Sequence, residues 1–296
     1  MRWNPILVKE LKTRARVVRI PILLMFYNAV VALIAVLMLL ASADIFNEGK
    51  YVDYSVMTSL FVGLGILQCC IGFLVTLVLT AGSISTEREK GTLDLMLVTG
   101  ASPYTVVGGK LFSAIMTSFL FAISSLPVLT IGTIFGGISI GDGVYLFFVF
   151  FLLSFYAGSI GILCSCFTKR SSLSVVSILI IEAGLMVGPF LLLEGVNTLF
   201  YSKAQGTLDA LVSLGGWVFV HLINPGMLLM GFYDKVIGED MISNLFFYSY
   251  GIDTDTALAY FLQKHFLQCC IGVQILISLI LLWIAIKKYA TIKTYE

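Results

Sequence analysis

Few residues in this sequence have the types and spacing that an intramembrane enzyme needs. No His-Glu-x-x-His run is present to bind zinc. Ser139 stands where the Gly-x-Gly-Asp pattern of aspartyl intramembrane proteases has its first glycine, before Asp142. A serine protease built from Ser102 and His265 would need the two side chains about 3 Å apart. The charge pattern described below puts them on opposite membrane surfaces, roughly 30 Å apart. The sequence therefore predicts none of these three protease classes.

The sequence also lacks a nucleotide-binding loop. Gly108-Gly109-Lys110 is similar to the end of a P-loop, but Leu111 follows it where Ser or Thr is required. Tyr104 stands where that loop has its first glycine. We therefore expect no nucleotide cofactor on this chain, and if ATP drives it, another subunit must bind the nucleotide.

The cysteines do not indicate a metal site or a disulfide framework. All six lie inside predicted membrane spans, where a thiol behaves as a small apolar group. Adjacent Cys-Cys pairs lack the Cys-x-x-Cys spacing of zinc and redox sites, and both histidines are distant in sequence. We expect no metal. The residues concerned are Cys69, Cys70, Cys164, Cys166, Cys269, Cys270, His221 and His265.

Glu182 is the one formal charge in the interior of a predicted span. A carboxylate at that depth costs about 2.5 kcal/mol or more unless it is protonated or paired. Two interpretations stay open. Glu182 either faces a cavity, where it contacts cargo or couples to protons, or it is a protonated acid hydrogen-bonded between helices.

Composition and long apolar runs place the chain in a membrane. Of its 296 residues 59% are hydrophobic and 12% charged, against roughly 45–50% and about 25% in soluble proteins. Each run reaches the ~20 residues that span a bilayer, where the backbone must pair with itself as a helix. A single domain, 1–296, is predicted, with spans at 20–43, 56–84, 104–135, 144–167, 171–193 and 266–286.

The distribution of basic residues orients these spans. With the N-terminus inside, only four of the 18 Lys and Arg residues fall outside, namely Lys50, Lys203, Lys235 and Lys264. Acidic residues show the opposite bias. By the positive-inside rule, both termini should be cytoplasmic in a multi-pass protein of the cell (plasma) membrane.

The outer segment 194–265 contains a further charge-free stretch at 210–233. Gly215-Gly216 and the turn signal Asn224-Pro225-Gly226 divide it into pieces too short to cross singly. We predict an outer re-entrant helical hairpin, which protein must cover at membrane depth. A seventh span is the alternative.

Two polar segments flank the first two spans. Residues 1–19 predict an interfacial helix that begins near Pro5 and has charges mostly on one face; a basic flank that only sets topology is the alternative. Its charged residues include Lys9, Glu10, Lys12, Arg14 and Arg16. The second segment, 85–103, packs both signs of charge before a glycine and a short amphipathic helix, so it should lie on the membrane or dock into a partner's groove.

The second segment carries a resemblance. Glu87-Arg88-Glu89-Lys90-Gly91-Thr92-Leu93, followed by Ser102-Pro103 and Gly109-Lys110-Leu111, resembles the loop after the second span of ABC-2 type transporter permeases. Asn4-Pro5-Ile6-Leu7 resembles the start of that family. Six spans, cytoplasmic termini, a basic first helix and a broken outer hairpin also match its all-α, type V exporter-like architecture.

The resemblance implies a division of labour between subunits. Two permease chains, the same or homologous, would pair, and two copies of a cytoplasmic ATPase would bind ATP and Mg²⁺. The short helix after the second span would couple ATPase closure to the spans, and the helix at 4–19 would flank the ATPase. The residues implied for coupling are Glu87, Arg88, Glu89, Lys90, Gly91, Thr92, Leu93, Asp94 and Leu97. Lipid is the other partner, and nucleic acid is not expected.

The function predicted from sequence is thus the permease subunit of an ABC exporter rather than an enzyme. The long aromatic outer segment favours a peptide, lipid or other amphipathic cargo. Two other functions remain open: a secondary transporter driven by protons through Glu182, and a membrane scaffold or immunity protein that transports nothing.

Overall fold

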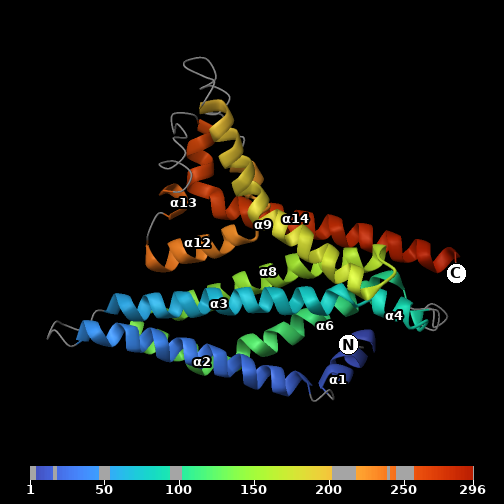
Figure 1. Ribbon diagram of the computed structural model, residues 1–296, viewed down its shortest axis with the longest axis horizontal. Coiled ribbons are helices and arrows are strands. Elements are labelled where there is room, and N and C mark those ends of the chain that lie inside the picture. The colour runs from blue at the N-terminus through green and yellow to red at the C-terminus, as the bar shows by residue number, and fades with distance from the viewer. Residues whose placement is uncertain are drawn as a thin grey trace.

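Helices are the regular secondary structure of the residues that the structure describes. A computed structural model describes residues 5–15, 19–46, 54–93, 102–201, 218–238, 241–244 and 257–295, and no strand occurs within these ranges. Figure 1 labels most of the helices, which are α1 (Pro5–Ala15), α2 (Arg19–Phe46), α3 (Tyr54–Ala81), α4 (Ser85–Glu89), α6 (Pro103–Ser124), α7 (Leu126–Gly136), α8 (Ile140–Phe167), α9 (Ser171–Tyr201), α11 (Val218–His221), α12 (Gly226–Ile237), α13 (Met241–Ser243) and α14 (Ala257–Tyr295).

Six segments among the described residues are long and apolar enough to cross a membrane. They are Ile20–Leu40, Met57–Glu89, Pro103–Ser124, Ile140–Phe167, Ser171–Leu192 and Lys264–Thr291. This confirms the prediction of an all-α polytopic protein. In the most apolar part of α8, 72% of the residues are buried. In the corresponding parts of α2 and α9, the buried share is 17% each. Thus α8 lies at the centre, and α2 and α9 present most of their side chains to the surroundings.

The central helices α3 and α8 approach each other closely because small residues line their contact. A Cβ atom added to Gly72 would collide with the Phe150 ring, and one added to Gly161 would collide with the side chain of Thr80. Glycine at these two positions lets the backbones approach, as small residues commonly do between membrane helices.

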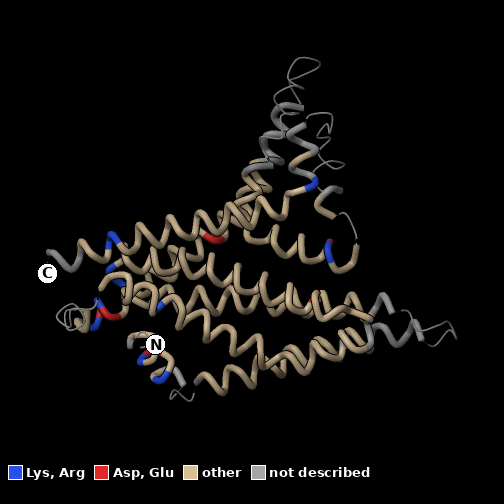
Figure 2. Tube along the Cα trace, turned by 180° about the vertical axis from the view of Figure 1, so that it is seen from behind, with Lys and Arg blue, Asp and Glu red and all other residues tan. Residues whose placement is uncertain are grey.

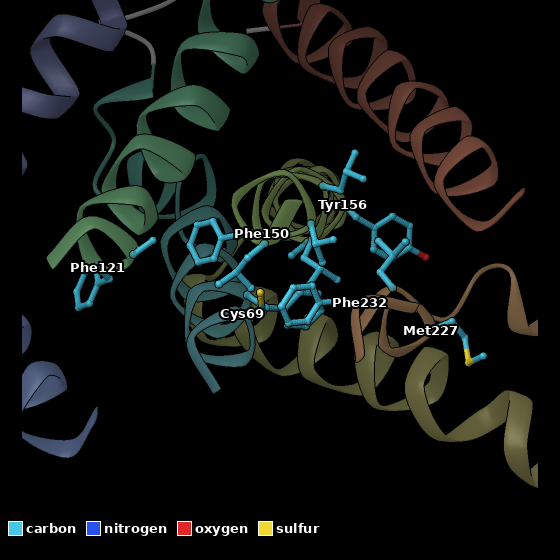
Figure 3. Packing of buried hydrophobic residues seen from close by; sticks show 14 of the residues in the cluster. Cys69, Phe121, Phe150, Tyr156, Met227 and Phe232 are labelled. Atoms are coloured by element: carbon cyan, nitrogen blue, oxygen red, sulfur yellow. The ribbon is translucent and has the colours of Figure 1, made fainter. Parts of the chain in front are cut away.

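Aromatic and aliphatic side chains fill the interior around this pair. Phe232 of α12 packs against Phe61 of α3, with ring centroids 6.3 Å apart. Phe119 of α6 meets Phe150 of α8 edge to face at 5.1 Å. Figure 3 shows this core, in which the helix α12 contributes buried side chains, including Met227, beside those of the long helices.

The structure divides the predicted span 104–135 into two helices at Ser125. Pro127 lies in the first turn of α7, where its ring and missing N–H prevent α6 from continuing. Ser125 is buried, and its hydroxyl is hydrogen-bonded. It donates to Gln68 Oε1 at 3.0 Å and accepts a hydrogen bond from the Tyr27 hydroxyl at 3.2 Å. Polar side chains of α2 and α3 therefore hold the interruption of α6.

Candidate functional site

Charged side chains gather at one end of the bundle, which we call the charged end. It comprises α1, α4, the first turns of α6 and the junction of α8 with α9. Figure 2 shows most of the coloured charges there, close to the two described chain ends. Lys9 and Lys12 of α1 are exposed, whereas Ile6 is buried. Within Pro5–Ala15, α1 thus has an exposed charged side and a buried apolar residue; the interfacial placement of residues 1–19 stays a prediction.

The short helix α4 is shaped by its C-terminal glycine. Gly91 has φ 66°, a left-handed conformation that glycine adopts without a Cβ penalty. The Thr92 amide donates to the Glu87 carbonyl at 2.9 Å, and the Gly91 amide to the Arg88 carbonyl at 3.1 Å. This pair of bonds is a Schellman motif, which ends a helix and reverses the chain. Leu93 follows directly and is buried.

The other end of α4 is held by a serine of α8. The Ser165 hydroxyl accepts hydrogen bonds from the amides of Ile84 and Ser85, each at 2.9 Å. These are amide groups at the start of α4, which have no partner inside the helix. Ser165 therefore caps α4 from another helix and ties it to α8.

Two charges of α4 match the ends of neighbouring helices. The Arg88 guanidinium donates to the carbonyls of Thr168 at 3.0 Å and Cys166 at 3.4 Å, where α8 ends. The Glu89 carboxylate accepts from the amide of Ser171 at 3.2 Å and from its hydroxyl at 2.7 Å, where α9 begins. A cation at a helix C-terminus and an anion at an N-terminus are both favourable for the helix dipoles.

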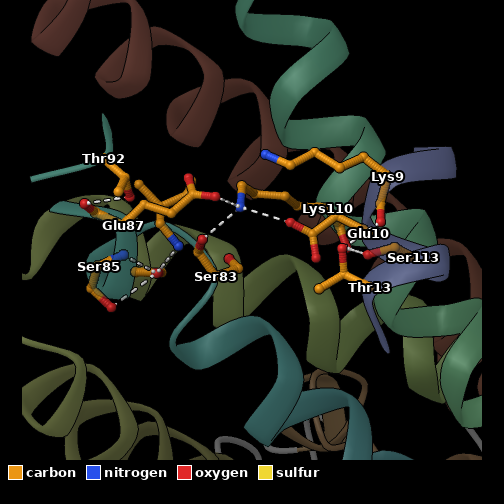
Figure 4. A network of polar contacts seen from close by, with 11 residues as sticks. Lys9, Glu10, Thr13, Ser83, Ser85, Glu87, Thr92, Lys110 and Ser113 are labelled. Carbon is orange, nitrogen blue, oxygen red and sulfur yellow. Dashed lines mark hydrogen bonds and ion pairs between the residues drawn. The ribbon is translucent and has the colours of Figure 1, made fainter. Parts of the chain in front are cut away.

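Glu87 joins a buried ion cluster around Lys110, drawn in Figure 4. The Lys110 ammonium lies 2.8 Å from Glu87 Oε1 and 3.3 Å from Glu10 Oε1. It also donates to the carbonyl of Ser83 at 2.7 Å. The Lys110 side chain is only 2% exposed, and the two carboxylate side chains 20% and 23%.

These contacts change the interpretation of the predicted coupling residues. Glu87, Arg88 and Glu89 bond within the chain, and Leu93 packs into its own core instead of a partner's groove. Lys90 remains exposed. Gly91 and Thr92 are exposed as well, so a partner would meet the C-terminal turn of α4. Of the other predicted residues, Arg14 lies in α1, whereas Arg16, Asp94 and Leu97 lie outside the described residues.

Lys110 was not among the site residues predicted from the sequence, although it occurs in the incomplete P-loop and in the segment that resembles the ABC-2 family. One signal was available: a lone lysine stands directly before the charge-free stretch that begins at Leu111. A lysine on such a helix is rarely buried without a partner. Its partners Glu87 and Glu10, which lie 23 and 100 residues away, could not be read from spacing.

Comparison with known families fits this architecture. A family model described as ABC-2 family transporter protein matches residues 41–287. The chain belongs to this family. The matched part includes α4 and Lys110, and α1 with Glu10 precedes it. No curated protein matches the sequence. The resemblance seen around Glu87 is thereby confirmed. This ABC-2 chain is a membrane component of an ABC transporter, and members of its family work with an ABC ATPase.

A second polar assembly of the ABC-2 chain surrounds the predicted hairpin turn Asn224-Pro225-Gly226. The Asn224 amide group donates to the Met186 carbonyl of α9 at 3.0 Å, and Asn224 Oδ1 accepts from the Gly226 amide at 2.8 Å. Pro225 precedes α12 and is buried. The turn is thus docked on α9, three residues before Pro189, which lies inside that helix.

Side chains of two other helices cover the carbonyls of this turn. The Tyr156 hydroxyl of α8 donates to the Ile223 carbonyl at 3.1 Å. Gln274 of α14 donates to the Asn224 carbonyl at 3.0 Å. Covering of this kind is what a broken helix requires at membrane depth. The 12 residues of α12 extend about 18 Å, short of the ~30 Å hydrocarbon core. The placement of the hairpin relative to a bilayer stays a prediction.

Glu182 is buried on α9, one turn before Met186. Its side chain is 4% exposed, and neither carboxylate oxygen has a hydrogen-bond partner among the described residues. It lies within electrostatic range of Tyr156 and Cys164 of α8. Among the described residues, no group of three or more His, Cys, Asp or Glu side chains is placed to hold a metal ion.

Proposed function

We propose that this ABC-2 chain is the permease subunit of an ABC exporter, and that its charged end receives a separate ATPase in the cytoplasm. The observation that carries the proposal is the placement of α4. Its exposed C-terminal turn, with Lys90 and Thr92, stands on a base that is bonded to α6, α8 and α9. A partner that pushes this turn moves the three helices on which it stands.

The charge distribution supports the proposed orientation. Lys9, Lys12 and Lys90 are exposed at the charged end, where the positive-inside rule puts the cytoplasm. Both termini would then be cytoplasmic, in the cell membrane. Labelling of Lys90→Cys by an impermeant thiol reagent should occur in inside-out vesicles and not in intact cells.

The proposed assembly contains two permease chains, identical or homologous, and two ATPase subunits. ATP and Mg²⁺ would bind in the ATPase subunits, and this chain would hold neither. ATP can shift such an assembly between arrangements only through its different interaction with each. We propose an outward direction of transport and an amphipathic cargo, such as a peptide or lipid.

The experiment is to co-express the chain with an ABC ATPase encoded beside it, to purify the complex in lipid nanodiscs and to measure ATP hydrolysis. Lys90→Glu should weaken copurification of the ATPase and lower its activity. The matched control is Lys264→Glu, which reverses the charge of another exposed lysine, in the N-terminal part of α14. It should change neither the copurification of the ATPase nor its activity. Purification of the chain from its native membrane with no ATPase attached would refute the proposal.

Glu182 supports a second candidate, a transporter driven by protons. The observation that favours it is a buried carboxyl group that has no hydrogen-bond partner among the described residues. Under that function, transport survives loss of the ATPase and stops in Glu182→Gln. Under the exporter proposal, transport stops when the ATPase is inactivated. A partner ATPase that no cargo stimulates would instead indicate a scaffold or immunity protein.

A further inference from the structure

Lys110 has all its hydrogen-bonding capacity satisfied by three different segments. An ammonium group has three N–H donors. They meet Glu10 of α1, the Ser83 carbonyl in the turn before α4, and Glu87 of α4. Lys110 itself belongs to α6, so that one side chain joins α1, α4 and α6.

The surroundings of Lys110 make this junction sensitive to its loss. A separate apolar cluster, which includes Ile6 of α1, Ile84, Leu93 and Val107, packs at the same end of the bundle. Water reaches the lysine poorly, since its side chain is 2% exposed. Without its positive charge, two carboxylates would face each other in a partly buried place, where like charges repel strongly.

The geometry also separates Lys110 from the surface that a partner could touch. The exposed residues at this end of α4 are Glu89 and the turn that follows it, Lys90 to Thr92. Lys110 lies beneath it and cannot contact an ATPase directly. Any effect of Lys110 on a partner must therefore pass through the groups that it binds, which are Glu87, Glu10 and the Ser83 carbonyl.

We propose that Lys110 is a positioning residue that makes α1 and α4 move together with α6. The inference rests on the proposed function, because it assigns Lys110 the role of passing movement of α4 to the interfacial helix. In this proposal the ion cluster transmits the movement. A displacement of α4 moves Glu87 and with it Lys110, and Glu10 passes the movement from Lys110 to α1.

The first test needs no ATPase and uses amide hydrogen exchange of the full chain in nanodiscs. Lys110→Met should speed exchange in both α1 and α4, because both lose their anchor. Glu10→Ala should speed exchange in α1 only. Glu89→Ala is the matched control, since it removes another carboxylate of α4, which among the described residues accepts its hydrogen bonds from Ser171 at the start of α9. It should leave exchange in α1 unchanged. Unchanged exchange of α1 in Glu10→Ala overturns the proposal, even where Lys110→Met does not fold.

The second test asks for transmission in the complex with the copurified ATPase. In the native chain, ATP should alter exchange in both α4 and α1. In Glu10→Ala, the response of α4 should persist and that of α1 should be lost, which a merely structural role would not produce. If ATP still alters amide exchange of α1 in Glu10→Ala, the proposed role of the ion cluster is refuted. Absence of any α4 response in the native complex refutes the proposed function instead, so the two failures are distinguishable.

Discussion

Tyr156→Phe should loosen the hairpin turn while leaving the packing of α8 intact. The change removes only the hydroxyl that bonds to the Ile223 carbonyl at 3.1 Å, and the buried ring stays in place. Hydrogen bonds inside membrane proteins average about 0.6 kcal/mol and reach about 1.7 kcal/mol. A buried carbonyl that loses its donor costs about 1–3 kcal/mol. We therefore expect a loss near 1 kcal/mol, or about 2–4 °C in Tm for a chain of this size.

The cysteines of the chain provide the assay. All six are free, and Cys69, Cys166 and Cys270 are fully buried. A maleimide dye that fluoresces on reaction with thiols therefore reports their exposure as the purified protein unfolds on heating. The control is Tyr289→Phe, the same substitution at another buried tyrosine, whose hydroxyl has no hydrogen-bond partner among the described residues.

Tyr289→Phe should leave Tm unchanged or raise it slightly, because no hydrogen bond is lost and a buried hydroxyl is removed. Equal falls in both variants would refute the reasoning, since the loss would then reflect a general effect of removing a phenol. No fall in Tyr156→Phe would refute it as well. That result would show that the hydroxyl of Tyr156 does not hold the turn.

Three further substitutions test the close packing and the caps by the same thermal assay. Gly161→Ala should destabilise the α3–α8 contact by about 1–3 kcal/mol through overpacking. Its control is Gly184→Ala, which has open space around its Cβ and should gain up to about 1 kcal/mol of stability from helix propensity. Equal effects of the two substitutions on Tm would contradict the packing argument. Ser165→Ala should cost about 1–3 kcal/mol by leaving two amides of α4 without an acceptor, while Ser159→Ala, which loses only a bond within its own helix, should cost less. Gly91→Ala should cost about 1–2 kcal/mol because of its positive φ, and an unchanged Tm would contradict the Schellman end of α4.

The overall class was predictable because it depends on local chemistry. Charge-free runs of membrane length predict helices wherever they occur, and six such helices are present among the described residues. The signal for the break at Ser125 was also local, since Pro127 cannot continue a helix, but the charge-free run extended over it. Length alone therefore joined α6 and α7 into one predicted span.

The directions of the charged side chains could not be predicted in the same way. The sequence places Glu87, Arg88 and Glu89 next to one another but does not tell which of them face inward. Their partners are up to 82 residues away in sequence. Only the folded arrangement brings the end of α8, the start of α9 and Lys110 around α4. The same holds for the turn at Asn224, whose need for cover was predictable but whose covering residues were not.

The two polar assemblies of the chain share the helices α8 and α9. On α8, Ser165 caps α4 and Tyr156 holds the hairpin turn, nine residues earlier and thus about 14 Å away along the helix. On α9, Ser171 binds Glu89, and the Met186 carbonyl binds the turn. Each helix segment between its two contacts acts as a rigid rod, so displacement of one assembly without the other requires at least one contact on α8 and one on α9 to break. Ser165 and Tyr156 both lie on α8, the most buried of the six spans. Removing either hydroxyl oxygen should therefore weaken both the stability of the fold and the mechanical link between the two assemblies that transport would use.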